Sequence, residues 1–140
     1  ENEVYPGIKE LLRVLTKQGI LCLVATSKPE IYAKKILDYY KLRTYFHYIA
    51  GANMDGTRTD KAEVIAYALK QIPAEYNNKK ILMVGDRSHD IIGAKKNGID
   101  CAGVLFGYGS REELEEAGAD FVADSVEAVR NIILLDTAMN

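Results

Sequence analysis

Hydrophobic positions in this chain follow two alternating patterns, one with the spacing of a helix face and one continuous. Within residues 8–15, apolar side chains recur at helical spacing, at Ile8, Leu11, Leu12 and Leu15. Gly19 follows where that helix would end. The apolar run 20–25 is too short for a helix and is bounded by glycine and hydroxyl residues, which is typical of a strand buried on both faces. The pattern therefore predicts a helix followed by a strand.

The same alternation continues along the chain. Further apolar runs predict strands at 46–50, 81–84, 101–106 and 119–123. Helices are predicted to begin near Pro29, Asp60, Asp90, Ser110 and Ser125, and a frayed tail is predicted from Leu135. Strands that alternate with helices predict an α/β fold, a three-layer Rossmann-like parallel sheet with helices on both faces. With no internal repeat or linker, residues 1–140 are expected to form one domain.

Composition narrows the class of function. The 140 residues are 48% apolar, which is enough for a core, and the net charge is −2 with both signs interspersed. A nucleic-acid partner is not expected, because it would require a basic excess. A membrane partner is not expected either, because no apolar run approaches the ~20 residues of a membrane span. Both cysteines lie in strand-like runs, which predicts buried free thiols and a cytoplasmic protein.

Polar side chains that suit a phosphate and a metal follow the predicted strands. Thr26 and Ser27 follow the first strand, Lys61 the second, and Asp86 and Asp90 the third. The carboxyl ends of parallel strands meet at one edge of a sheet. Hydroxyl groups beside a helix N-terminus bind anions, a lysine neutralises phosphate charge, and carboxylates with phosphate oxygens suit Mg²⁺. The pattern predicts a phosphate site with a divalent metal.

Each of these residues also has a purely structural interpretation. Thr26 and Ser27 could cap a helix, and Lys61 could be a solvated first-turn residue. For Asp86 and Asp90 the metal site is favoured, because two carboxylates four residues apart at a helix entrance repel unless a cation joins them. Further stretches are interpreted structurally: Gly107-Tyr108-Gly109 as a tight loop, and the charged runs 111–113 and 115–116 as a solvated helix face.

Taken in order, these residues resemble the motifs of the haloacid dehalogenase-like hydrolases, within them the phosphoglycolate phosphatase and nucleotidase-like group. The resemblance covers essentially the whole chain and is carried by Tyr5-Pro6-Gly7 with Leu11-Leu12, Val24-Ala25-Thr26-Ser27-Lys28, Lys61, Val84-Gly85-Asp86-Arg87-Ser88-His89-Asp90, Gly103-Val104, Gly107-Tyr108-Gly109 and Glu113-Leu114. It implies that Thr26 and Lys61 bind the phosphoryl group, Lys61 with a catalytic role; Ser27 is assigned to the phosphate by the residue pattern alone. It also implies that Asp86 and Asp90 form the metal site, Asp86 as Mg²⁺ ligand and Asp90 as supporting acid.

One family motif is missing from the sequence. The family's first strand ends in Asp-x-Asp-x-Thr, whose first aspartate attacks phosphorus. The only similar stretch here, Asn53-Met54-Asp55-Gly56-Thr57, has an amide at the nucleophile position and is interpreted as a loop. The resemblance thus implies the C-terminal part of the core domain without its first, central strand. The nucleophile and the cap domain are expected upstream of Glu1.

The resemblance implies a Mg²⁺-dependent phosphatase that hydrolyses a small phosphorylated metabolite through an aspartyl-phosphate intermediate. Residues 1–140 alone are expected to be inactive. The alternative is a non-catalytic module that binds phosphate and metal. A third interpretation, a response-regulator-like domain, fits less well because its acid cluster would follow the first strand. The sequence leaves the substrate and the oligomeric state open.

Overall fold

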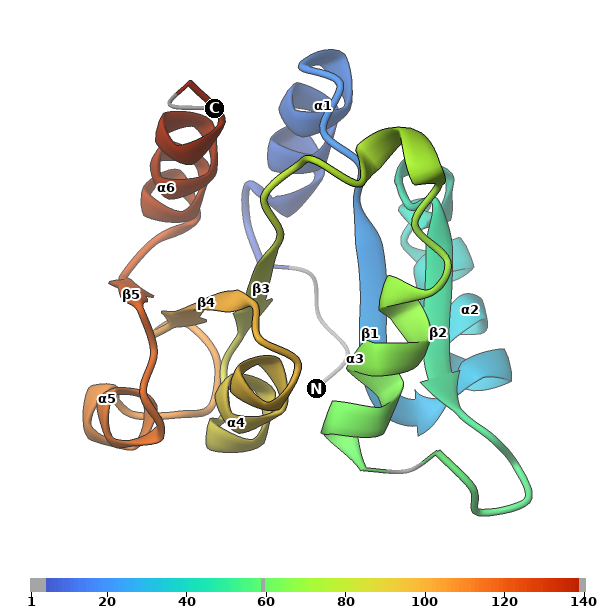
Figure 1. Cartoon of the computed structure of the whole chain (residues 1–140). Helices are drawn as coiled ribbons and strands as arrows, with labels where there is room; N and C mark the ends of the chain where they lie inside the picture. Colours follow the sequence, from blue (N-terminus) through green and yellow to red (C-terminus); the bar gives the residue numbers. More distant parts are fainter. Residues whose placement is uncertain (1–4, 59, 139–140) are drawn as a thin grey trace. The chain divides into compact units, whose positions relative to one another are not determined.

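Helices and strands alternate along the part of the chain that the structure describes (Figure 1). A computed structural model describes residues 5–58 and 60–138. The chain divides into two compact units, Glu1–Gln71 and Ile72–Asn140, here called the N-terminal unit and the C-terminal unit. Each unit has its own parallel sheet and its own apolar cluster. The predicted α/β class with parallel strands is confirmed.

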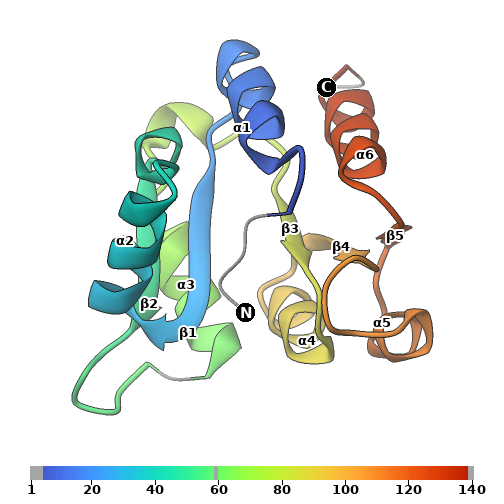
Figure 2. The same cartoon turned by 180° about the vertical axis from the view of Figure 1, so that it is seen from behind.

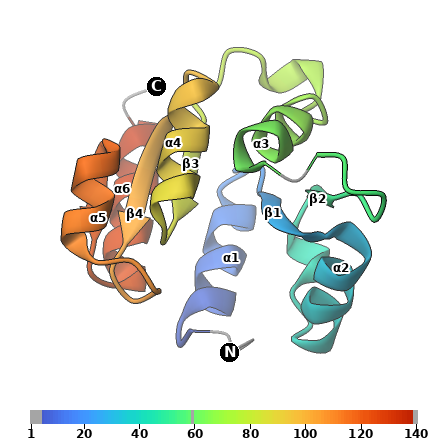
Figure 3. The ribbon, with the colours of Figure 1, turned by 90° about the horizontal axis from the view of Figure 1, so that it is seen from below.

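The N-terminal unit is a two-stranded sheet covered by helices. Its elements are α1 (Ile8–Lys17), β1 (Leu23–Pro29), α2 (Glu30–Tyr39), the short 3₁₀ helix η1 (Arg43–Tyr45), β2 (Tyr48–Ala52) and α3 (Lys61–Leu69). β1 runs parallel to β2, and α2 and α3 pack on opposite faces of the pair (Figure 3). Ala50 of β2 packs against Val64 and Ala68 of α3, because the apolar positions of α3 recur at the spacing of one helix face.

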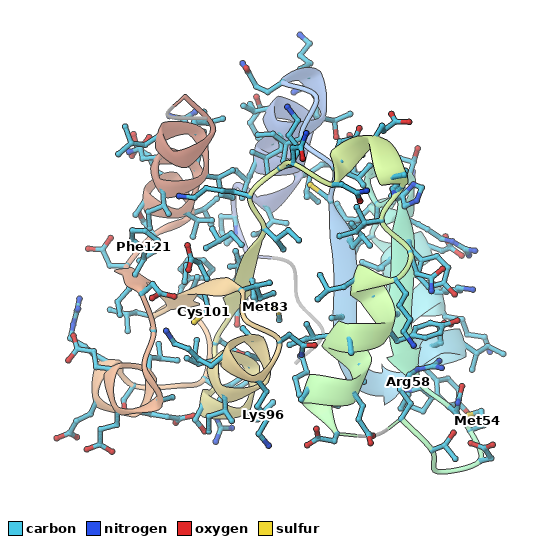
Figure 4. All side chains as sticks on the ribbon, viewed as in Figure 1. Met54, Arg58, Met83, Lys96, Cys101 and Phe121 are labelled. Atoms are coloured by element: carbon cyan, nitrogen blue, oxygen red, sulfur yellow. The ribbon has the colours of Figure 1, made fainter. Side chains whose placement is uncertain are left out.

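The C-terminal unit is a three-stranded sheet in the order β3-β4-β5. Its elements are the short 3₁₀ helix η2 (Ala74–Tyr76), β3 (Leu82–Gly85), α4 (Ser88–Lys96), β4 (Asp100–Val104), α5 (Arg111–Ala117), β5 (Phe121–Ala123) and α6 (Val126–Ala138). The helices α4 and α5 lie on one face and α6 on the other (Figure 2). Cys101 is buried with Ile91 and Leu114, and Met83 packs against this cluster (Figure 4).

The predicted helix ends and caps match the structure. Gly19 and Gly98 follow α1 and α4 with positive φ angles of 78° and 71°, which glycine adopts without strain. The side chains of Asp60, Ser110 and Ser125 each accept a hydrogen bond from a first-turn N–H, of α3, α5 and α6 respectively. Local hydrogen bonding thus positions the start of three helices.

The first predicted strand was misplaced. β1 begins at Leu23 and continues through Pro29, so Thr26 and Ser27 lie inside the strand rather than after it. Pro29 has φ −56° and ψ 139°, an extended conformation, and is aligned with Ala52 beyond a register shift. A proline cannot donate in a ladder but fits the last position before a helix, so α2 begins at Glu30.

Other boundaries differ by a few residues. β2 ends at Ala52 rather than at 50, and β4 ends at Val104 rather than at 106. The expected tail from Leu135 is wrong as far as Ala138, where α6 ends; residues 139 and 140 lie outside the described residues. Among the helices of residues 5–58 and 60–138, none has the length and apolar character needed to cross a membrane.

Four of the five described strands have a single hydrogen-bonded neighbour within the described residues. β1 and β2 pair with each other, and β3 and β5 each pair only with β4. The expectation that β1 is buried on both faces is wrong, since its residues from Leu23 to Thr26 are only half-buried. A strand in the middle of a sheet would have partners along both edges and helices over both faces.

Candidate functional site

Asp90 shapes the turn that connects β3 to α4. Its side chain is buried, with 4% of the residue exposed, and its Oδ2 accepts hydrogen bonds from the N–H groups of Asp86 (3.0 Å) and Arg87 (3.2 Å). Gly85 leaves the necessary space, because a Cβ at that position would lie 2.5 Å from this oxygen. Asp90 is therefore an acceptor for the turn, and Oδ2 is committed to backbone N–H groups.

Asp86 is fixed by the loop between β4 and α5. Its Oδ2 accepts from the N–H of Tyr108 (2.9 Å), and its carbonyl oxygen accepts from the N–H of Gly109 (2.8 Å). A Cβ on Gly107 would overlap the Asp86 carboxylate, so only glycine fits there. The other carboxylate oxygen, Oδ1, accepts no hydrogen bond from the described residues. The structure therefore orients the Asp86 carboxylate by one oxygen and leaves the other available.

A third carboxylate, Glu113, lies beside the same turn. Its Oε2 accepts from the backbone N–H of Ser88 (2.7 Å) and from Nε of Arg87 (2.9 Å). The hydrogen bond from Arg87 and the one from the Ser88 N–H hold the pKa of Glu113 below its usual value. The interpretation of the charged runs 111–113 and 115–116 as a solvated face is therefore wrong for Glu113.

In the N-terminal unit, Thr26 and Ser27 lie near the carboxyl end of β1. Thr26 is half-buried, and its Oγ1 accepts from the N–H of Lys28 at 3.1 Å. Ser27 is exposed. The backbone of Gly51 in the neighbouring strand passes close to this end of β1, since a Cβ there would lie 2.6 Å from the Lys28 carbonyl oxygen. The hydroxyl of Thr26 thus stabilises the last residues of β1, which lead directly into α2.

Lys61 is the first residue of α3, immediately after the capping residue Asp60. The loop that leads to α3 is fastened by Arg58, whose Nε donates to the carbonyl oxygen of Gly51 at 2.9 Å (Figure 4). The guanidinium of Arg58 also lies 3.8 Å from the ring centroid of Tyr67 in α3. Arg58 therefore ties together β2, the loop and the helix that begins with Lys61.

The stretch 53–57 forms an exposed loop after β2. Asn53 donates through Nδ2 to the hydroxyl of Thr57 (2.7 Å), and Asp55 accepts from the N–H and the hydroxyl of Thr57. Met54 is 69% exposed (Figure 4). The prediction that this segment is a loop rather than a catalytic strand end is confirmed.

The predicted site residues are divided between the two units. Thr26, Ser27 and Lys61 belong to the N-terminal unit, whereas Asp86 and Asp90 belong to the C-terminal unit. The structure brings Asp86 and Asp90 together through a shared backbone turn.

Sequence reasoning missed the contributions of Glu113 and Arg58. Both belong to polar stretches that resemble ordinary solvated surface, so the residue types alone gave no signal. The two glycines that flank Tyr108 were a signal, since paired glycines often mark a close approach of backbone to another group.

Comparisons with known proteins show the family of this chain. The family model described as haloacid dehalogenase-like hydrolase matches residues 1–104. The 5′-nucleotidase of Pseudomonas aeruginosa is 39% identical over 135 residues, covering 95% of this chain and 59% of that protein. The tyrosine-protein kinase PtkA of Mycobacterium tuberculosis is 38% identical over 135 residues, covering 94% of this chain and 45% of that protein. The crystal structure of a predicted phosphatase from Clostridium acetobutylicum has a TM-score of 0.86 at 43% identity, covering 95% of this chain and 61% of the other.

Phosphoglycolate phosphatases from Pseudomonas species match at 29% and 32% identity. The chain spans 59% of the length of the nucleotidase, 45% of PtkA and 61% of the Clostridium acetobutylicum protein. The resemblance expected from the motifs is confirmed, because the family model matches residues 1–104, which is most of the chain. The chain belongs to the haloacid dehalogenase-like hydrolases.

Proposed function

We propose that this protein takes part in Mg²⁺-dependent hydrolysis of a small phosphomonoester. The observation that carries this proposal is the Asp86 carboxylate, which has Oδ2 fixed by the Tyr108 N–H and Oδ1 accepting nothing from the described residues. A carboxylate held in one orientation, with a second oxygen available, suits a hard cation. Membership in the hydrolase family supports the same chemistry.

In this proposal the described residues supply one carboxylate ligand to Mg²⁺, that of Asp86. Among residues 5–58 and 60–138 there is no cluster of three or more His, Cys, Asp or Glu side chains that could hold a metal. Mg²⁺ keeps several waters and takes few protein ligands beside phosphate oxygens, so one carboxylate from this part of the chain is compatible with it. In this proposal Asp86 is the ligand, and Asp90 holds the turn. Bound Mg²⁺ would neutralise charge on the phosphoryl group.

The phosphate-binding side of the proposal rests on the N-terminal unit. Thr26 and Ser27 would offer hydroxyl donors to the phosphoryl oxygens, and Lys61 would neutralise their charge. Phosphoryl transfer depends mainly on positioning and charge neutralisation. These three residues would therefore contribute to the reaction by holding the phosphoryl group and neutralising its charge.

The nucleophile is proposed to lie outside residues 1–140, with the family's first strand and its cap domain. An aspartate there would attack phosphorus, the bond to the leaving oxygen would break, and water would then release phosphate and restore the carboxylate. Two observations support this proposal. The sequence has no Asp-x-Asp-x-Thr motif, and the chain spans 59% of the nucleotidase. Isolation of a native, active species that begins at Glu1 would overturn it.

The test compares residues 1–140 with a longer form that carries the nucleophile, using p-nitrophenyl phosphate with and without Mg²⁺. We expect Mg²⁺-dependent turnover by the longer form and none by residues 1–140. In the longer form, Asp86→Ala should abolish turnover, while the surface variant Glu112→Ala should leave it unchanged. Full turnover by Asp86→Ala would refute the metal assignment.

The second candidate function is a non-catalytic module that binds phosphate and metal. Its support is the absent nucleophile motif. A longer form that binds inorganic phosphate but does not hydrolyse the ester would favour the module. PtkA, as its name states, is a kinase, so assays should also include a protein tyrosine as acceptor for the phosphoryl group. A cytoplasmic location is also proposed, on the basis of the unpaired Cys22 and Cys101.

A further inference from the structure

The carboxylate of Glu113 lies between the two loops that shape the Asp86 site. On the α4 side, its Oε2 accepts from the Ser88 N–H at 2.7 Å and from Arg87 Nε at 2.9 Å. On the α5 side, the carboxyl lies near Gly109, since a Cβ built on that glycine would be 3.5 Å from the Glu113 carboxyl carbon. Glu113 therefore hydrogen-bonds to the start of α4 and lies beside the loop that holds Asp86.

Two segments of the chain hold Asp86, and Glu113 connects these segments to each other. The turn between β3 and α4 holds the Asp86 N–H through Asp90, and the loop before α5 holds Asp86 through the N–H groups of Tyr108 and Gly109. Glu113 is the side chain that connects this loop's helix directly to the first turn of α4. Ser110 fixes Glu113 in turn, because its Oγ accepts from the Glu113 N–H at 3.1 Å.

We propose that Glu113 is a positioning residue for Asp86: it joins the start of α4 to the loop before α5 and so sets the orientation of the Asp86 carboxylate. The metal-binding consequence rests on the proposed function, whereas the positioning itself does not. Glu113 is not proposed as a metal ligand, because its Oε2 is committed to Ser88 and Arg87.

The physical reason is preorganisation. Without the Glu113 carboxylate, the Ser88 N–H in the first turn of α4 loses its acceptor and Arg87 loses its ion-pair partner. The two loops then move more independently, and the bonds from Tyr108 and Gly109 to Asp86 open more often. If the Asp86 carboxylate must be oriented when the metal binds, the metal binds less tightly. Loss of an outer-shell partner typically lowers metal affinity by about 10–100-fold.

The experiment uses amide hydrogen exchange followed by NMR on residues 1–140. In Glu113→Ala, we expect faster exchange at Ser88, Tyr108 and Gly109, with Cys101 in the core unchanged. Glu112→Ala is the matched control, because Glu112 is also an acid in the first turn of α5 but is exposed. Glu113→Gln keeps an acceptor oxygen for Ser88 but no charge for Arg87, so it should give an intermediate result and remain folded if the alanine variant does not.

A Mg²⁺ titration of the same samples provides the second measurement. We expect the dissociation constant for Mg²⁺ to rise by about 10-fold or more in Glu113→Ala and to stay at the wild-type value in Glu112→Ala. Unchanged exchange at Tyr108 and Gly109 in both Glu113 variants would overturn the inference. If wild type binds no Mg²⁺, the metal assignment of the proposed function fails, and the exchange data still decide the role of Glu113.

Discussion

Gly85 lies directly against the carboxylate of Asp90, with no room for a side chain between them. A Cβ at position 85 would lie 2.5 Å from Oδ2 and 2.6 Å from Cγ of Asp90. Since Oδ2 accepts from the N–H groups of Asp86 and Arg87, the space at Gly85 is what allows a buried carboxylate to organise this turn. The buried position of the Asp90 carboxylate therefore depends on the glycine at position 85.

This relationship predicts the effect of Gly85→Ala. The added methyl group must displace Asp90 or bend β3, and overpacking of this kind costs about 1–3 kcal/mol. We expect a lower midpoint of unfolding in urea and loss of amide protection at Asp86 and Arg87. Val84→Ala serves as the control, because Val84 is partly exposed and should change stability less. Equal midpoints for Gly85→Ala and wild type would show that the turn can relax without cost.

The stack of Arg58 on Tyr67 predicts that lysine cannot replace this arginine. The planar guanidinium both covers the ring at 3.8 Å and donates to the Gly51 carbonyl oxygen, a combination that an ammonium group cannot reproduce. We expect Arg58→Lys to lower the free energy of unfolding by about 1–2 kcal/mol. Arg43→Lys, in an exposed ion pair with Asp38, should change it little. A similar loss in both variants would contradict a special role for the stack.

Tyr48 is predicted to ionise at unusually high pH. Its hydroxyl lies 3.0 Å from that of Tyr67, and this hydrogen bond, with burial as the second cause, raises the pKa of Tyr48 to about 12. The folded pKa is above the unfolded value, so the stabilisation is present below about pH 10 and is lost as pH rises through about 12. We expect Tyr67→Phe to lower the pKa of Tyr48.

The measurement is the ultraviolet difference titration between each protein and the same protein carrying Tyr48→Phe. The difference isolates the ionisation of Tyr48 from the other eight tyrosines. Tyr32→Phe is the control, since Tyr32 is exposed and lies on α2, whereas Tyr67 lies on α3. An unchanged Tyr48 titration in Tyr67→Phe would mean that the hydroxyl pair is not the cause.

Asp120 is predicted to contribute to acid sensitivity. The Cys101 N–H, with Lys95 as a further partner, holds the pKa of Asp120 below its usual value. A depressed folded pKa gives stabilisation that is present above the unfolded value of about 3.9 and lost as pH falls through the folded pKa. We therefore expect Asp120→Asn to lose less stability than wild type between pH 7 and pH 3.

Urea unfolding at both pH values tests this expectation. Asp100→Asn is a suitable control, because Asp100 is an exposed acid at the start of the same strand, β4. If Asp120→Asn and wild type lose the same free energy of unfolding on acidification, other carboxylates account for the acid response.

The sequence pattern was sufficient where local forces decide. Helical spacing of apolar residues, the caps at Asp60, Ser110 and Ser125, and the glycine at position 19 each depend on residues within one or two turns. These signals predicted the alternating α/β order and the acid pair after β3. They misplaced the end of β1, because whether Pro29 ends a strand or begins a helix depends on its alignment with Ala52 in another strand.

By itself the sequence determined the fold class, the family resemblance and the residue types available for phosphate and metal chemistry. Only the tertiary structure decided what each acid does: Asp90 accepts from the turn, Asp86 keeps one oxygen available, and Glu113 joins α5 to α4. The reason is that a hydrogen-bond partner 22 or 25 residues away along the chain leaves no local pattern. Three carboxylates of the same chemistry thus take three roles that only their contacts distinguish.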